Sequence, residues 1–530
     1  MASPVFSSAT PPASSSSYHL SHVTESHPGV QGGSLTSSMI NSPRLGNLWR
    51  ALRSVRITTL FYSSLVAVLG SLSFGYGMGF SSPALADLED NKGKHTSFDK
   101  TIYSDTFNAL TAVGGLIGAP LAGWLVDRNG RQFTMVLCSL PFSIGWLLIL
   151  ITHDITGPLF RPLLFIGRFV VGIGIGGTSL VVPLYIAEIS PSDLRGLFGA
   201  LNQLAVTIGI LLVQSLGIGL HYEWLCVIGL AILLVYVPLS SMTLRESPRW
   251  LISSGKNSVA GKVLAWLRGP DFDVNQEQME IEAQLASEEK LTLLEQLRSF
   301  STRPVFHPLI LAMFLMFFQQ FSGINAIIFN GESIFEEAGV SNPAVITAVS
   351  IGAVQVVATL VGVILTDIVG RKILLTIGGI TMCVSLVVLS IYDFLNNEPY
   401  CHPDASPSDP KCKDHLQPLA ITAMMFYIVG FSIGWGALPW LLASELIPLR
   451  VKGAGVGIAT CFNWICATIV LLSFGSYQDA VEPWGAFLSF AVVCLLSVIF
   501  VLVFVPETKG KTLEEIEDHF NRGGKQYTPI

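Results

Sequence analysis

Residues 127–131 read DRNGR directly after a long apolar run, and residues 367–371 read DIVGR after another such run, 240 positions later. Two pairs of glutamates repeat at similar offsets of 257 and 261 positions: Glu188 with Glu445, and Glu246 with Glu507. Three independent pairs with nearly one spacing indicate that the chain arose by duplication of one unit. We therefore expect two halves of similar architecture.

The composition places this duplication in a membrane. Of the 530 residues, 51% are hydrophobic and only 13% are charged, well below the roughly one quarter of a soluble domain. The mean hydropathy is +0.58 over the whole chain, so the bilayer must surround most of the fold. The net charge of −7 shows no basic excess, which argues against a nucleic-acid partner. Most of the eight Cys lie in apolar runs and are expected to act as small hydrophobes.

Apolar runs of about 20 residues predict twelve transmembrane helices, and hence an all-α membrane protein. The first six lie near 57–81, 106–126, 133–152, 160–187, 200–220 and 223–243, and the second six near 307–330, 344–366, 373–395, 417–443, 454–475 and 484–505. The expected organisation is a disordered N-terminal tail (1–56), a six-helix bundle (57–243), a charged helical linker (244–306), a second bundle (307–505) and a C-terminal tail (506–530). Two such halves suit alternating access to a site between them.

The basic residues predict the orientation. Arg53, Arg131, Arg249, Arg371 and Lys509 all fall on one side of the predicted spans. Because cytosolic loops are enriched in Lys and Arg, this side and both termini are expected to be cytosolic. The plasma membrane and an endosomal or lysosomal membrane remain equally open.

The repeated charged clusters lie at this predicted cytosolic face, where each Arg can bind a carboxylate or the carbonyls that end a helix. One interpretation is that they are positive-inside signals only. The carboxylates favour ion pairs that form and break as the carrier changes state. The candidate gating residues are Asp127, Arg131, Glu188, Arg195, Glu246, Arg249, Asp367, Arg371, Glu445, Arg450 and Glu507.

Isolated polar side chains interrupt the apolar spans. Six of them are amides: Gln203, Gln319, Gln320, Asn325, Gln355 and Asn463. A neutral amide both donates and accepts hydrogen bonds, so a group of them can bind several hydroxyls without requiring a charged ligand. Trp440 and Trp464 stand near them and offer an aromatic face for a sugar ring. The alternatives are hydrogen bonds between helices for the amides and ordinary packing for the tryptophans.

A single cation, Arg168, lies deep inside the fourth span, where a charge needs a partner or an aqueous lining. We expect a structural role, with contact to a transport path as the alternative. The same span reads GIGIGG at 172–177, but no strand precedes it, so a dinucleotide site is rejected in favour of close helix packing.

From about residue 57 to residue 520 the chain resembles the sugar porter family of the major facilitator superfamily. The motifs that carry the resemblance are Gly130-Arg131, Gly167-Arg168, Pro183-x-Tyr185-x-x-Glu188, Arg195-Gly196, Glu246-Ser-Pro-Arg249, Gln319-Gln-x-Ser-Gly-Ile-Asn325, Gly370-Arg-Lys372, Pro439-Trp440 and Pro506-Glu-Thr-Lys-Gly510. The resemblance implies a monomeric hexose carrier without a cofactor, whose substrate is bound by the six amides with Trp440 stacking on the ring.

The chain also departs from that family. Gln355 replaces the usual Asn of the eighth span, Asn330 replaces a Tyr after the seventh-span motif, and Gln132 replaces a second basic residue. Residues 436–439 read GALP where GPxP is common. The first outer loop and residues 74–83 resemble the intracellular-leaning glucose carriers and the trehalose-transporter-like group.

Sugar–proton porters of this family carry an Asp in the first span where this chain has Gly77, and no Asp or Glu lies between Arg56 and Asp87. This predicts facilitated uniport. The alternatives are a proton-coupled symporter, with Glu332 as its candidate acid, a carrier of trehalose or a polyol, and a non-transporting sensor. An intramembrane enzyme is set aside because neither a metal-ligand motif nor an intramembrane His pair is present. Cys401 and Cys412, in the predicted outer loop, are expected to form a disulfide.

Overall fold

The computed structural model describes most of the chain from residue 57 onward. The described residues are 57–90, 102–155, 157–191, 194–269, 272–287, 295, 299–397, 417–448, 451–511 and 513–521. The predicted N-terminal tail therefore lies outside the described residues, as does the loop with Cys401 and Cys412, so the expected disulfide stays a prediction.

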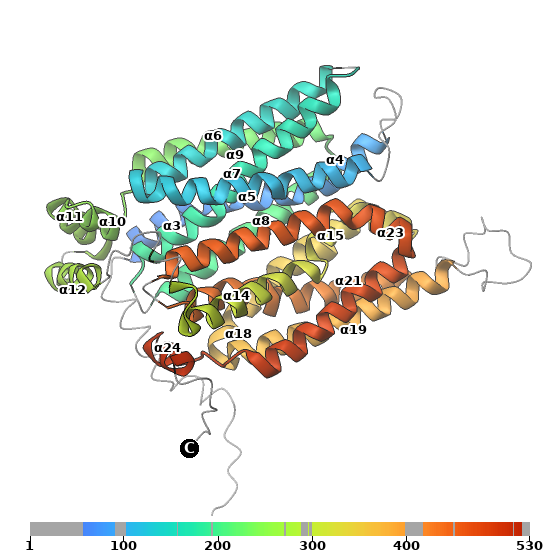
Figure 1. The fold of residues 1–530 in the computed structure, drawn as a ribbon. Coiled ribbons are helices and arrows are strands. Elements are labelled where there is room, and N and C mark those ends of the chain that lie inside the picture. Colours follow the sequence, from blue (N-terminus) through green and yellow to red (C-terminus); the bar gives the residue numbers. More distant parts are fainter. Residues whose placement is uncertain are drawn as a thin grey trace, which may run out of the picture. The chain divides into compact units, whose positions relative to one another are not determined.

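Six membrane-spanning segments form the first half (Figure 1). Its helices are α3 (Ile57–Gly79), α4 (Ser81–Asp90), α5 (Ile102–Asn129), α6 (Arg131–Ile151), the short η1 (Thr152–Asp154), α7 (Phe160–Ile189), α8 (Arg195–Gly217) and α9 (Tyr222–Thr243). Helices α5 and α7 pack so closely that a Cβ on Gly114 would fall on the backbone of Phe169 and Gly172. The glycines of the fourth span thus permit the close helix packing expected of small residues in membranes.

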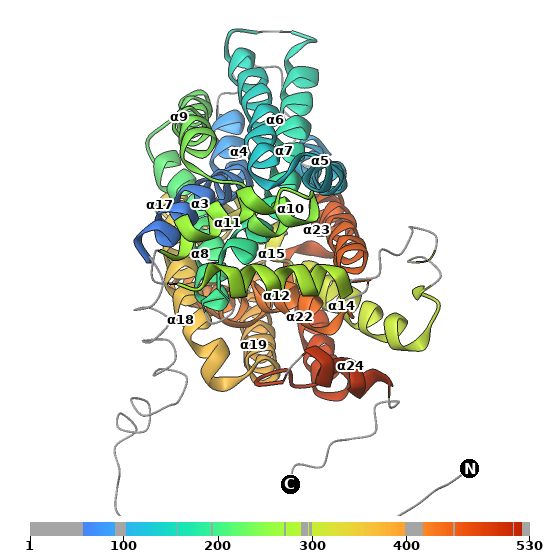
Figure 2. The same cartoon turned by 90° about the vertical axis from the view of Figure 1, so that its left-hand side faces the viewer.

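In the described part of the linker, three short helices connect the halves at one end of the bundle (Figure 2). We call this end the linker end and the opposite end the far end. The three helices are α10 (Pro248–Ser253), α11 (Asn257–Arg268) and α12 (Val274–Ser287). Arg268 ties them to the bundle: its Nε and Nη2 donate to Glu277 on α12, and its Nη1 donates to the carbonyl of Ile189 at the end of α7 at 2.8 Å. The linker is thereby anchored to a transmembrane helix.

The second half repeats the arrangement with more interruptions. Its helices are α14 (Arg303–Phe321), α15 (Ile324–Phe329), α16 (Gly331–Glu337), α17 (Pro343–Thr347), the π-helix η2 (Ala348–Ala353), α18 (Val354–Val369), α19 (Arg371–Asn397), α21 (Gln417–Gly430), the π-helix η4 (Phe431–Trp435), α22 (Leu438–Leu446), α23 (Lys452–Phe504) and α24 (Leu513–Asn521). Single π-helical turns of this kind are frequent at functional sites.

The last two predicted spans are continuous in α23, which is 53 residues long. A helix of that length extends for about 80 Å, far more than the roughly 30 Å of a bilayer core. Glu482 breaks it with a φ of 59°, directly before Pro483, which has no N–H to donate. The chain turns back there, so the eleven helices that are long enough to span a membrane, among the described residues, provide twelve spans. The fold is the predicted all-α arrangement of two six-helix halves.

Candidate transport site

Four of the predicted amides form one hydrogen-bonded chain in the second half. Asn325 Nδ2 donates to Gln320 Oε1 at 2.6 Å, Gln320 Nε2 donates to Asn463 Oδ1 at 3.0 Å, and Asn463 Nδ2 donates to Gln319 Oε1 at 2.9 Å. All four side chains are buried. The chain of amides connects the consecutive helices α14 and α15 to α23, more than 100 residues further along the chain, and its members are uncharged.

Gln319 continues this chain to a break in the tenth span. Its Nε2 donates to the carbonyls of Trp435 at 2.7 Å and Gly436 at 3.1 Å, where η4 ends. In a regular helix the N–H of Pro439 would pair with the carbonyl of Trp435, but proline has no N–H. The side chain of Gln319 supplies the missing donor. The nitrogen and the oxygen of its side-chain amide are therefore both hydrogen-bonded within the protein.

The other predicted ligands lie apart from this chain of amides. Gln203 is half-buried on α8, and Gln355 is buried on α18 with no hydrogen-bond partner for its Oε1. Trp440 is half-buried and packs on an apolar cluster of α14, α22 and α23. Met316 belongs to that cluster, and its sulfur accepts a hydrogen bond from Asn463 Nδ2 at 3.4 Å. The structure thus unites four predicted ligands directly and places Trp440 on the apolar cluster that includes Met316.

The second tryptophan of this region lies between the halves. Trp464 of α23 is buried, and its ring fills the space where a Cβ on Gly115 of α5 would stand. Its indole N–H has no partner among the described residues. A donor left free at the contact of the two halves is available to a ligand or to water.

Arg168 lies among neutral groups. Its Nη1 donates to the carbonyl of Gly77 at 3.2 Å and its Nη2 to the hydroxyl of Ser81 at 2.5 Å. The guanidinium also lies over the rings of Phe80 and Phe107. These contacts join α7 to the junction of α3 and α4, near Pro83, which has no backbone donor. They support the structural role expected for Arg168.

The repeated motifs produce the same cap in each half at the linker end. The carboxylate of Glu246 accepts the backbone N–H of Arg131 at 2.7 Å, and that of Glu507 accepts the backbone N–H of Arg371 at 3.1 Å. An anion is favourable at a helix N-terminus, here of α6 and α19. Burial raises the pKa of Glu246 above its usual value, against the lowering effect of the N–H donors.

Glycine is required beside each cap. Gly130 and Gly370 have φ angles of 94° and 110°, which disfavour residues with a side chain. A Cβ at either position would also collide with the carboxylate of the capping glutamate. This explains why both copies of the motif place Gly directly before Arg.

Each motif arginine binds a carboxylate of its own half. Arg131 forms two hydrogen bonds with Glu188, at 2.8 and 2.7 Å, and Arg371 Nη2 lies 3.3 Å from Glu445 Oε1. Asp127 is 84% exposed and 4.0 Å from Arg131. Arg249 is half-buried on α10. The side chains of Arg195, Asp367 and Arg450 lie outside the described residues.

The two halves are bonded to each other at the far end. Asp105 of α5 accepts the backbone N–H groups of Gly475 at 3.0 Å and Ser476 at 3.2 Å in α23. One turn along α5, Asn108 Nδ2 donates to Asn330 Oδ1 at 3.0 Å. On α4, the hydroxyl of Ser82 accepts the N–H of Glu332 at 3.0 Å. The structure is closed at this end.

The sequence analysis did not single out Asp105, Asn108 or a further buried amide, Gln214. A usable signal was present in the spacing: Gln214 follows Gln203 by 11 residues, three helical turns, which places both on one face of α8. Asp105 is a carboxylate at the start of an apolar span. Like an intramembrane amide, such a group indicates a candidate functional residue.

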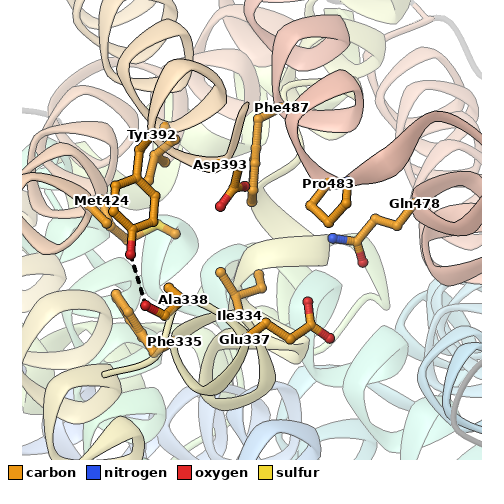
Figure 3. Close-up of a pocket in the computed structure, with 12 residues that line it drawn as sticks. Ile334, Phe335, Glu337, Ala338, Tyr392, Asp393, Met424, Gln478, Pro483 and Phe487 are labelled. Carbon is orange, nitrogen blue, oxygen red and sulfur yellow. Dashed lines mark hydrogen bonds between the residues drawn. The ribbon is translucent and has the colours of Figure 1, made fainter. Parts of the chain in front are cut away.

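A cavity of about 320 Å³ lies at the far end within the second half (Figure 3). Ile334, Glu337, Asp393, Gln478 and Phe487 are among its lining residues. None of the predicted sugar ligands lines it, so it is separate from the amide chain. Among the residues that the structure describes, no group of three or more His, Cys, Asp or Glu is placed to hold a metal ion.

Comparison with known proteins identifies the architecture. A family model described as "Sugar (and other) transporter" matches residues 63–520. Facilitated glucose transporter member 8 of solute carrier family 2 from Mus musculus is 37% identical over 483 residues, covering 88% of this chain and 96% of the relative. Sugar transporter ERD6-like 6 from Arabidopsis thaliana is 35% identical over 488 residues, covering 92% and 94%.

Other relatives carry different sugars. The facilitated trehalose transporter Tret1 of Drosophila willistoni is 33% identical over 464 residues, covering 87% of this chain and 51% of that protein. A solved structure of the proton:xylose symporter XylE bound to 6-bromo-6-deoxy-D-glucose superposes with a TM-score of 0.71 at 26% identity, covering 87% of this chain and 99% of that one. The chain therefore belongs to the sugar transporter family and has the major facilitator fold.

Proposed function

We propose that this protein is a facilitative uniporter of hexoses such as glucose. The observation that carries the proposal is the buried chain of four amides, which offers donors and acceptors without a charge. Sugar hydroxyls both donate and accept, and so they match such groups. The mouse relative, a facilitated glucose transporter, supports the choice of hexose.

In this proposal Gln320, Asn325 and Asn463 bind hydroxyls directly. A sugar inserted between Asn325 and Gln320 exchanges an amide–amide bond for bonds to its own hydroxyls, so no buried group is left unpaired. Gln203 and Gln355 complete the ring of ligands from α8 and α18. Trp440 stacks on the C–H face of the sugar.

Gln319 has a different task. The nitrogen and the oxygen of its side-chain amide are both hydrogen-bonded within the protein. Gln319 therefore holds the break in the tenth span at Trp435 and Gly436, which we call the hinge, and connects the sugar ligands to α22. We propose that binding at Asn463 is thereby communicated to the tenth span.

Uniport is supported by the surroundings of Arg168. A proton-coupled carrier needs an acid that titrates in the transport path, and the position expected to supply it is Gly77, whose carbonyl accepts a hydrogen bond from Arg168. Transport then follows the sugar gradient alone.

The charged clusters are proposed to gate the linker end. Arg131 and Arg371 are bound to carboxylates of their own halves while the far end is closed. Closing the linker end would bring the clusters of both halves together. In this proposal Asp127, Arg195, Arg249, Asp367 and Arg450 then form pairs across them. We further propose that the linker end and both termini face the cytosol and that the monomer is the working unit.

Trehalose is a second candidate substrate, favoured by the Drosophila relatives. A disaccharide would occupy the same amides with one of its rings.

The test is counterflow of labelled glucose in proteoliposomes, with a pH dye inside and unlabelled glucose, trehalose, xylose and inositol as competitors. Glucose exchange without a pH change is expected. A pH change would replace uniport with symport, preferential inhibition by trehalose would change the substrate, and no exchange of any of these sugars would contradict the proposal. Gln320→Ala should reduce sugar uptake without reducing the abundance of the protein in the membrane.

A further inference from the structure

Gln214 of α8 is buried without a hydrogen-bond partner. Its side chain is 2% exposed, and neither Nε2 nor Oε1 is bonded to another described residue. Buried amides are almost always paired, because leaving both ends unpaired is strongly unfavourable. A packing role would be served better by Leu or Met. The closed structure therefore does not explain this side chain.

Its position does. Gln214 Oε1 lies 3.0 Å from the point where a Cβ on Gly352 would stand, so the amide is pressed against the π-helix η2 of the other half. The same point is 3.0 Å from the Cα of Leu211 on α8. The contact of α8 with η2 is thus tight, and the amide fits because residue 352 is glycine. We call this contact the α8–η2 seam.

Two further amides lie on the elements that form the seam. Gln355, three residues after Gly352, is buried and its Oε1 has no partner. Gln203 lies three turns from Gln214 on the same face of α8. The far end is held shut by Asp105, Asn108 and Ser82, so the seam opens when these bonds break.

We propose that Gln214 is an additional sugar-binding residue, which binds a hydroxyl of the substrate when the α8–η2 seam is open at the far end. The inference rests on the proposed sugar transport and extends it to a residue on the access route. In the open state the amide faces the path, where it can donate to and accept from a hydroxyl.

Closure of the far end then removes Gln214 from contact with the sugar. Gly352 and Leu211 move against the amide, and the sugar keeps the other proposed partners, among them Gln320, Asn325 and Asn463. The amide left unpaired in the closed state makes closure less favourable, which keeps the far side accessible until sugar has bound. Gln214 thus acts on the far side of the cycle only.

A purely structural role of Gln214 would have different consequences for transport. If Gln214 only packs the helices or holds a water, its removal changes stability and the rate of transport, but not the recognition of individual hydroxyls. Discrimination between glucose and its monodeoxy analogues therefore separates the two roles.

The experiment compares wild type, Gln214→Leu and Gln214→Asn in proteoliposomes of determined orientation. Inhibition of glucose uptake by glucose and by each monodeoxy-glucose is measured from the far side and from the linker side. Ser215→Ala is the matched control, because Ser215 is the next residue on α8 and is exposed. Gln214→Asn keeps the amide and guards against failure of Gln214→Leu to fold.

For Gln214→Leu we expect about three- to tenfold weaker glucose inhibition from the far side, the range of one lost hydrogen bond. Discrimination against one monodeoxy-glucose should disappear, and the linker-side values should not change. Gln214→Asn should shift in the same direction by less. Unchanged far-side discrimination in both variants, or equal losses on both sides, would overturn the inference while leaving sugar transport intact. Failure of wild type to bind any of these sugars would overturn the proposed function itself and this inference with it.

Discussion

Arg168 Nη1 donates a hydrogen bond to the backbone carbonyl of Gly77 at 3.2 Å, and the guanidinium is completely buried. A buried cation is normally expected to face a carboxylate. Among the described residues, the guanidinium of Arg168 instead contacts a carbonyl, a hydroxyl and two aromatic rings. The position where the resemblance to sugar–proton porters would place an acid thus offers only its backbone, and this relationship leads to the first prediction.

Gly77→Asp should make glucose uptake respond to an imposed pH gradient, because it places a titratable group beside Arg168. A Cβ at position 77 would lie 3.0 Å from the tip of the Ile175 side chain, which can move aside. Uptake is measured in proteoliposomes with and without the gradient, and Gly77→Ala is the steric control. A response of equal size in wild type and Gly77→Ala would contradict the uniport interpretation.

Gln320→Ala and Gln319→Ala should fail in different ways. Gln320 is proposed to bind sugar, so its loss should raise the KM for glucose about tenfold. Because Asn325 Nδ2 and Asn463 Oδ1 lose their partner, the unfolding temperature of the purified protein should also fall. Binding and thermal unfolding in detergent measure the two effects. A normal KM in Gln320→Ala would remove Gln320 from the site.

Gln319→Ala should lower the unfolding temperature, since it leaves the buried carbonyl of Trp435 without a donor. The expected loss is about 1–3 kcal/mol, the cost of an unsatisfied buried group. Gln319→Glu keeps the size but replaces the donor with an acceptor, and it should not rescue stability. If Gln319→Ala were as stable as wild type, the proposed support of the hinge would be wrong.

Asp105→Ala should favour opening of the far end, because it removes the acceptor of the N–H groups of Gly475 and Ser476. A cysteine introduced at Ile351, which is fully buried, reports the opening through its reaction with a membrane-impermeant maleimide. We expect about tenfold faster labelling, equal to the loss of one or two charge-assisted bonds. Asp479→Asn, on an exposed neighbour, should label like wild type.

Gly130→Ala and Gly370→Ala should each destabilise the linker end by about 1–2 kcal/mol or more, because φ is positive and the new Cβ meets a carboxylate. Gly453→Ala and Gly457→Ala are suitable controls, since a Cβ at either position would be free of contacts within 4 Å. Thermal unfolding and membrane abundance are the measurements. Equal values in all four variants would refute the role of the caps.

Much of the fold could be predicted because it depends on local properties. The length and hydropathy of each segment define a span, and the repeated motif around Arg131 and Arg371 reveals the duplication. Even the turn between the last two predicted spans coincides with Pro483, although α23 is otherwise continuous from Lys452 to Phe504. The amides of α14 were identified for the same reason: polar groups within apolar sequence are conspicuous without knowledge of their neighbours.

The partners of those residues were decided only by the tertiary structure. The sequence by itself determined which side chains are costly to bury, namely the amides, Arg168 and the repeated carboxylates. It did not determine that Gln319 pairs with a carbonyl orphaned by Pro439, that Arg168 meets Gly77, or that Gln214 faces η2 unpaired. Such pairings join segments more than 90 residues apart. They depend on how whole helices pack, and helix packing is a property of the assembled bundle rather than of any one span.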